Sequence, residues 1–237
     1  MPGHVSRVLC AADPRGDERA VERLVDAAGR HDAHLIALVG ELSGGGDGRS
    51  AFRSIFRVLG RSGLPAFWVP GPGDAPIEAY LREAYITEIV VPLLHGVHGT
   101  AAFASGQLLV AGFGGEVSDD PDAARDEVGR LHYPRWEAEY RLKLLWELKD
   151  YQLVLLFSTP PLHKARGTGR SEAVTELVGT YRPRVVVCAG ERGSQTIGRS
   201  TIVAPGSLSE GQYALVDART HDVELLQLPA AQAGVAG

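Results

Sequence analysis

The chain lacks the residues that would place it in several common protein classes. Its 237 residues include two cysteines, Cys10 and Cys188, which are far apart in the sequence. This spacing matches no zinc motif and provides no disulfide framework, so we expect both thiols to be buried. No stretch approaches the ~18 apolar residues of a membrane span, and the N-terminus shows no apolar signal segment. We therefore expect a cytoplasmic protein without membrane association.

Two further absences exclude classes of ligand. The net charge is -5, so the sequence lacks the basic excess of a nucleic-acid-binding surface, and no nucleic-acid partner is expected. The segment after the first expected strand is Asp13-Pro14-Arg15-Gly16 and not G-x-G-x-x-G, which argues against a dinucleotide-dependent dehydrogenase. The glycine-rich residues 43–48 lack the lysine of a phosphate-binding P-loop.

The hydrophobic content of 44% is sufficient for one large core. Apolar runs alternate with amphipathic segments along the first third of the chain, which predicts parallel strands joined by right-handed crossovers. Shorter β-like runs between residues 89 and 115 indicate antiparallel strands. The expected strands are 5–12, 34–40, 66–70, 89–91, 100–104, 108–112, 153–157, 185–189, 213–217 and 222–228, and the expected helices are 17–29, 50–61, 77–84, 133–150 and 171–180.

The segment 114–150 is expected to be an insertion in a single domain that spans residues 1–228, followed by a disordered tail at 229–237. Its first part, 114–130, is acidic and weakly periodic, which indicates a loop or a lid. In the second part, Trp136 and Tyr140 begin a row of apolar residues at four-residue spacing, which predicts the strongest helix of the chain. We expect these aromatic side chains to pack internally or to form a homo-oligomer contact.

Acidic residues follow each of the first three expected strands. Asp13, Glu41 and Asp74 stand in these turns, and the carboxyl ends of parallel strands form the edge of a sheet where ligands bind. The alternative for Asp74 is an ordinary turn or helix-capping role. The glycine-rich loop after the strand 185–189 and the turn 204–207 are expected to return to the same edge.

The order of these strand ends resembles the calcineurin-like metallophosphoesterase superfamily over about residues 5–228. That family carries D-x-H, G-D, G-N-H-[DE], a later His, G-H-x-H and N-P-G-S at successive strand ends. The resemblance implies a four-layer α/β/β/α sandwich of two mixed sheets flanked by helices. It also implies phosphoester hydrolysis at two divalent metals, which bind the phosphoryl group and activate a water molecule.

The chain keeps the acidic positions of these motifs and loses the nitrogen ligands. Asp13 matches the first aspartate, Glu41 the bridging aspartate and Asp74 the last acid of G-N-H-[DE]. The positions of the family's His and Asn residues hold Arg15, Pro72, Gly73, Ser158, Glu191 and Gly193. The resemblance therefore argues against an intact two-metal centre. It leaves at most one weak site for Mg²⁺, Mn²⁺ or Ca²⁺, formed by oxygen ligands from Asp13, Glu41, Asp74 and Glu191.

Cations lie at or beside several of these positions. We expect a small phosphorylated molecule or another anion to be bound by Arg15, Lys164, Arg192 and Ser158. The alternative is that the arginines pair with Asp13 and Glu41 in a structural ion network. The candidate catalytic residues are Asp13, Arg15 and His163, the last as an acid or base near neutral pH.

Two functions fit the sequence. One is a divergent metallophosphoesterase with a degraded metal site, weak or absent activity and a retained anion-binding cleft. The other is a non-catalytic pseudoenzyme that acts as a binding or protein-interaction module.

Overall fold

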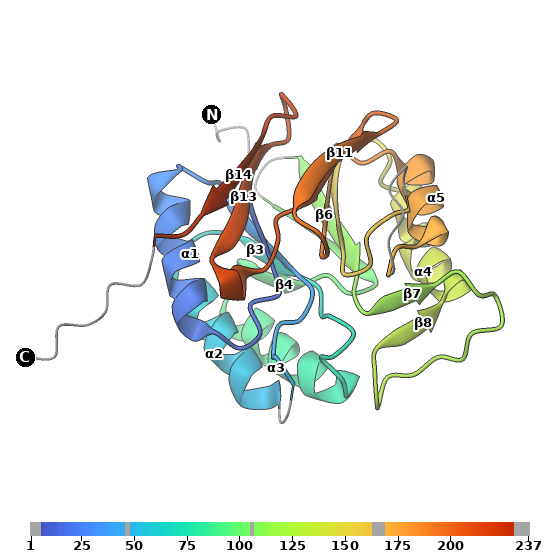
Figure 1. Cartoon of the computed structure of the whole chain (residues 1–237), viewed down its shortest axis with the longest axis horizontal. Coiled ribbons are helices and arrows are strands. Elements are labelled where there is room, and N and C mark those ends of the chain that lie inside the picture. The colour runs from blue at the N-terminus through green and yellow to red at the C-terminus, as the bar shows by residue number, and fades with distance from the viewer. Residues whose placement is uncertain (1–5, 46–47, 105–106, 163–168, 230–237) are drawn as a thin grey trace, which may run out of the picture.

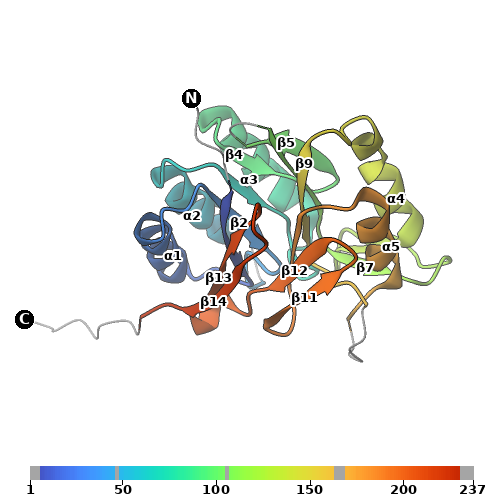
Figure 2. The ribbon, with the colours of Figure 1, turned by 90° about the horizontal axis from the view of Figure 1, so that it is seen from above.

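Two six-stranded mixed sheets pack face to face, and helices cover the outer face of each sheet (Figure 1). The computed structural model describes residues 6–45, 48–104, 107–162 and 169–229. Seen from above, α1 and α2 lie on one side of the molecule and α4 and α5 on the other, with the sheets between them (Figure 2). The expected four-layer sandwich is confirmed.

The first sheet has the order β14-β13-β1-β2-β3-β4. Strands β1 to β4 are parallel to one another, β13 pairs antiparallel with β1 at one edge, and β14 pairs antiparallel with β13. The inner strands are buried on both faces because helices cover one face and the second sheet covers the other. The bounds are β1 (Arg7–Ala12), β2 (Leu35–Val39), β3 (Ala66–Trp68), β4 (Leu94–Gly96), β13 (Gln212–Asp217) and β14 (Val223–Gln227).

The second sheet has the order β11-β12-β10-β9-β6-β5. Its four central strands are parallel, and β11 and β5 pair antiparallel at the two edges. The antiparallel pairing expected before residue 115 is therefore limited to β5 and β6. The bounds are β5 (Thr100–Phe103), β6 (Leu108–Phe113), β9 (Gln152–Phe157), β10 (Val185–Cys188), β11 (Gly193–Ile197) and β12 (Ser200–Ala204).

Helices α1 (Glu18–Arg30), α2 (Gly48–Arg61) and α3 (Ile77–Val90) pack on the first sheet, and α4 (Arg135–Leu142) and α5 (Glu172–Tyr181) pack on the second. Two short 3₁₀ helices, η1 and η2, span Lys143–Trp146 and Leu208–Glu210. The carboxylate of Asp17 accepts a hydrogen bond from the Ala20 amide and caps α1. No helix in the described ranges is long and apolar enough to cross a membrane.

A central core fills the space between the sheets. Cys10 from the first sheet and Val187 from the second belong to this cluster, while Cys188 belongs to the core under α4 and α5. Burial raises the pKa of Cys10, and it raises the pKa of Cys188 to about 12. Both cysteines are free and buried, as expected from the sequence.

Two predicted elements are wrong. The expected strand at residues 89–91 is absent, because α3 continues to Val90 and the amide of Val91 donates to the Thr87 carbonyl. Packing of α3 against α2 outweighs the strand preference of its β-branched residues. The expected helix 133–150 is shorter, because it begins after Pro134 and gives way to η1 at Lys143.

The aromatic residues of that helix face solvent. Trp136 is 57% exposed and Tyr140 is 62% exposed, so the expectation that they pack internally is wrong. The homo-oligomer contact through residues 133–150 stays a prediction.

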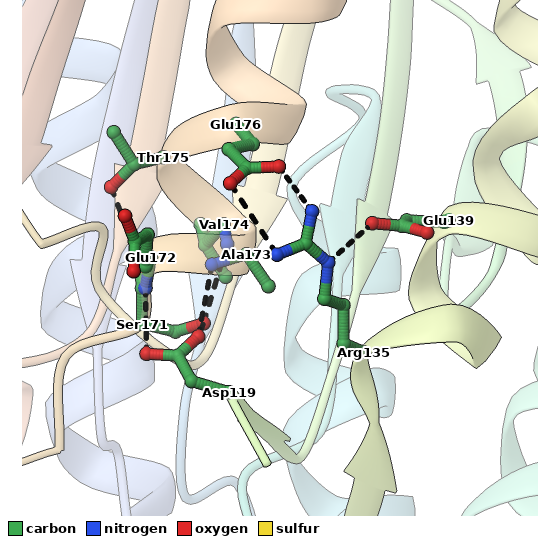
Figure 3. A network of polar contacts seen from close by, with 9 residues as sticks. All are labelled: Asp119, Arg135, Glu139, Ser171, Glu172, Ala173, Val174, Thr175 and Glu176. Atoms are coloured by element: carbon green, nitrogen blue, oxygen red, sulfur yellow. Dashed lines mark hydrogen bonds and ion pairs between the residues drawn. The ribbon is translucent and has the colours of Figure 1, made fainter. Parts of the chain in front are cut away.

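The segment 114–130 is attached to the second helical layer. Its strand β7 (Glu116–Ser118) pairs with β8 (His132–Pro134) in a small parallel sheet. Next to β7, the carboxylate of Asp119 accepts hydrogen bonds from the Ser171 hydroxyl (2.6 Å), the Glu172 amide (2.8 Å) and the Ala173 amide (2.9 Å) (Figure 3). Burial raises the pKa of Asp119, but these hydrogen bonds together lower it by more, and the net shift is downward. Asp119 thus caps α5 from outside the helix.

The C-terminal segment leaves the sandwich beside α1. The carbonyl of Pro229 accepts a hydrogen bond from Arg23 at 2.9 Å. The remainder of the predicted disordered tail, 230–237, lies outside the described residues.

Candidate functional site

The turns after β1, β2 and β3 lie together at the carboxyl ends of these parallel strands. The amide of Arg15 donates to the Glu41 carbonyl at 2.9 Å, and the amide of Val69 donates to the Leu38 carbonyl at 3.1 Å. These turns bring Asp13, Glu41 and Asp74 to one place, which we call the acidic edge. The three acids therefore share one edge of the sheet, as the order of the strands predicts.

Asp13 occupies a strained position at the end of β1. Its φ is +50°, in the left-handed region, and its Oδ1 accepts a hydrogen bond from the Glu41 amide at 2.8 Å. A Cβ on Gly40 would lie 2.1 Å from this oxygen, so only glycine fits there. Burial raises the pKa of Asp13, although the Glu41 amide and the charge of Arg15 act in the opposite direction.

Glu41 extends toward the turn after β3. Its Oε1 accepts a hydrogen bond from the Gly73 amide at 2.9 Å. Burial raises the pKa of Glu41, the Gly73 amide lowers it, and the negative charges of Asp74 and Asp13 raise it again. The charge of Arg130 lowers this pKa, so an arginine of the 114–130 segment also acts on the site. The net effect is a raised pKa.

Asp74 is almost fully buried, with 1% of its surface exposed. Its carboxylate accepts four hydrogen bonds, from the amides of Leu42, Ser43 and Gly71 and from the Ser43 hydroxyl, at 2.7 to 2.8 Å. These donors occupy the acceptor positions of a carboxylate. Asp74 therefore joins the turns after β2 and β3, and this arrangement argues against metal ligation by its side chain.

The second sheet contributes the other wall of the site. The hydroxyl of Ser207, in the turn after β12, donates to the Asp13 carbonyl at 3.3 Å. Ala189, after β10, reaches Gly40, since its Cβ is 3.2 Å from the Cβ position of that glycine. The buried hydroxyl of Ser158 donates to the Pro70 carbonyl, so it joins the two sheets and is not directed to a ligand.

Of the predicted cations, Arg15 lies at the acidic edge, whereas Arg192 lines a pocket at the end of the second sheet together with the predicted acid Glu191. Arg15 is exposed beside Asp13, and Arg192 donates to the Leu226 carbonyl at 3.0 Å. Within the described residues neither arginine forms an ion pair, so the alternative of an ion network with Asp13 and Glu41 is not what the structure contains. Glu191 is 88% exposed and lies 3.9 Å from Arg170. His163 and Lys164 lie outside the described residues.

Comparison with known proteins identifies the family. The sequence matches the family described as metallophosphoesterase, calcineurin superfamily, over residues 47–228. The chain belongs to this family. No curated protein matches the chain.

Solved structures share the fold of this chain. The crystal structure of TT1561 from Thermus thermophilus is 42% identical, with a TM-score of 0.88 over 95% of this chain and 100% of that one. A second crystal structure is 26% identical, with a TM-score of 0.85 over 97% of this chain and 100% of that one. An archaeal phosphodiesterase shares the fold at 6% identity, with a TM-score of 0.53 over 94% of this chain and 99% of the other.

Metallophosphoesterases generally bind divalent metals, so the donor groups at the acidic edge decide whether this chain suits two of them. The described residues contain no group of three or more His, Cys, Asp or Glu side chains arranged to hold a metal ion. Asp74 is occupied by hydrogen bonds, and Glu191 extends into solvent. Only Asp13 and Glu41 remain as oxygen donors beside each other within the described part of the edge. These residues do not fit a two-metal centre, and the weak single-metal site stays a prediction.

Two arginines near the acidic edge and the neighbouring loop, Arg130 and Arg170, stand outside the family motifs, so no motif in the sequence indicates them. The hydrogen bond between Glu41 and Gly73 is a further feature that was not predicted. The sequence did contain a signal for this hydrogen bond. Glu41 is longer than the aspartate of G-D, and Gly73 is smaller than the histidine of G-N-H-[DE], so the two changes in size are complementary.

Proposed function

We propose that this protein is a divergent phosphoesterase with a degraded metal site. Its acidic edge binds a small phosphorylated molecule and hydrolyses phosphoesters far more slowly than a two-metal enzyme of the same fold. The observation that carries the proposal is the position of Glu41, whose carboxylate bonds to the Gly73 amide where the family motif has a histidine.

Family membership supports the phosphoester hydrolase chemistry, and the residues present limit its rate. Asp13 has the properties of a general base, because its pKa is raised and one of its oxygens is held by a backbone amide. In two-metal sites the metals activate the attacking water and stabilise the charge of the transition state, and this stabilisation is the main source of catalysis. A site without two metals provides less of it.

The charges at the acidic edge favour anion binding with an affinity that depends on pH. The carboxylates of Asp13 and Glu41 repel an anion when both are ionised, whereas Arg15 and Arg130 attract it. Since burial raises the pKa of both acids, their protonation as the pH falls removes repulsion. We expect anion affinity to rise toward acidic pH. Sulfate is the suitable probe, because its own charge does not change in this range.

The experiment combines turnover with binding. Hydrolysis of an aryl phosphomonoester and an aryl phosphodiester is measured with Mn²⁺, Mg²⁺, Ni²⁺ and Zn²⁺, and Asp13→Ala is the control. The proposal expects a slow rate above this control, together with sulfate binding that weakens in Arg15→Ala. A rate equal to the control with sulfate binding retained would favour the non-catalytic binding module. Absence of both would overturn the proposal.

A further inference from the structure

A pocket of about 170 Å³ opens next to the acidic edge, at the end of the second sheet. Its lining includes the apolar residues Pro160, Cys188 and Ile202, and the polar residues Arg170, Glu191, Arg192 and Gln195. We call it the Arg170 pocket. A volume below the roughly 300 Å³ of a typical complete ligand site suits a single chemical group and not a whole molecule.

Arg170 is a largely buried cation that has few interactions with other protein groups. Its side chain is 15% exposed, yet its single ion pair joins Nη2 to Glu191 Oε2 at 3.9 Å. No hydrogen bond from this guanidinium is present within the part of the chain that the structure describes. A guanidinium has five N–H donors, and no nitrogen of Arg170 is among the buried side-chain atoms without a partner, so these donors face water in the pocket. An oxyanion that enters the pocket would meet donors that no protein acceptor within the described residues occupies.

Glu191 is suited to give way to a ligand. Its side chain is 88% exposed, and its distance from Arg170 exceeds that of a hydrogen bond. An exposed ion pair of this kind contributes little to stability. A phosphate or carboxylate that binds Arg170 in a bidentate manner would replace the Arg170–Glu191 ion pair with shorter, charge-assisted hydrogen bonds.

Ala189 connects the pocket to the acidic edge. This residue lines the pocket, and its Cβ is 3.2 Å from the Cβ position of Gly40, which in turn adjoins Oδ1 of Asp13. The pocket therefore adjoins the acidic edge at Ala189.

We infer that the Arg170 pocket binds a terminal oxyanion, a phosphate or a carboxylate, of the ligand whose phosphoester lies at the acidic edge. This inference rests on the proposed function and adds to it the ligand class: a small molecule with two anionic groups. Arg170 is the binding residue, and Glu191 is its intramolecular competitor.

Calorimetric titration tests the pocket with sulfate for the phosphate class and succinate for the carboxylate class. Arg170→Ala is expected to weaken binding of one of these probes at least tenfold, Arg170→Lys to weaken it less because charge remains without the planar fork, and Glu191→Gln to strengthen it severalfold. Arg199→Ala, an exposed arginine in the turn between β11 and β12, is the matched control and should bind as wild type.

The outcomes separate the two proposals. Melting temperatures of the unliganded variants identify any loss of fold, and Glu191→Gln tests the pocket without removing Arg170. If Arg170→Ala binds both probes like wild type while Arg15→Ala weakens sulfate, the pocket inference is overturned and the proposed function stands. If Arg15→Ala has no effect while Arg170→Ala does, the pocket binds anions and the acidic-edge proposal fails. If no variant differs from wild type, both fail.

Discussion

The carboxylate of Glu41 lies where the side chain of residue 73 would begin. A Cβ on Gly73 would be 2.5 Å from Oε2 of Glu41, and the Gly73 amide donates to Oε1 at 2.9 Å. The longer acid and the missing side chain are therefore one structural change. The extra methylene of Glu41 brings its carboxylate to the Gly73 backbone, at the residue that matches the histidine of the family motif.

Substitution of Gly73 tests this relationship. Gly73→Ala is expected to cost about 1 kcal/mol, because the Glu41 carboxylate must move and lose its hydrogen bond. In a Glu41→Ala background the same change should be neutral or slightly stabilising, since alanine restricts the unfolded chain. A double-mutant cycle from urea unfolding measures the coupling.

Gly71→Ala is the matched control for this cycle. Its Cβ would lie 2.5 Å from the Glu41 backbone nitrogen, so the clash persists whatever side chain residue 41 carries. Equal costs of Gly73→Ala in both backgrounds would contradict the account.

Asp74 should prove essential for stability. Asp74→Ala leaves the buried amides of Leu42, Ser43 and Gly71 without their acceptor. Each such orphaned group costs about 1–3 kcal/mol, so we expect a loss of at least about 3 kcal/mol in the free energy of unfolding, measured by urea titration. A loss below about 1 kcal/mol would show that these amides find other partners and that the two turns do not depend on Asp74.

The raised pKa of Glu41 predicts a pH dependence with a definite sign. In the folded protein this pKa lies above the usual value of 4.5, so the folded state gains stability from protonation below 4.5 and loses that gain as the pH rises. Glu41→Gln keeps an oxygen acceptor for the Gly73 amide without the charge. The stability of the variant relative to wild type should therefore increase with pH above 4.5 and then level off. Chemical denaturation at several pH values measures the difference, and a difference that falls with pH would contradict it.

Asp119 should hold the 114–130 segment to α5. Asp119→Ala removes the acceptor for two amides in the first turn of the helix, and we expect a loss of about 1–2 kcal/mol. Proteolytic cleavage within 114–130 should also become faster. Asp122→Ala, an exposed acid in the same segment, is the control and should change stability by less than about 0.5 kcal/mol. Equal behaviour of the two variants would show that Asp119 does not anchor the segment.

Most of the architecture could be predicted from local pattern. Continuous apolar runs such as Val185–Cys188 identify strands buried on both faces, and their order identifies the family. The length of α3 and the early end of α4 could not be predicted, because packing against α2 and the change to η1 override local preference. The order of the strands predicted that Asp13, Glu41 and Asp74 would share one edge, but it did not predict the role of each acid. The hydrogen bonds that Asp74 accepts identify it as a structural residue and not a metal ligand, and these bonds cannot be predicted from the sequence.

Metal content tests the central claim most directly. We propose that this metallophosphoesterase fold has lost its two-metal centre. Purified protein is incubated with Mn²⁺ or Zn²⁺, desalted and analysed for metal per chain, with Asp13→Ala treated in parallel. We predict less than one retained equivalent, similar in both proteins. Two equivalents retained by the wild type and lost in Asp13→Ala would contradict the account.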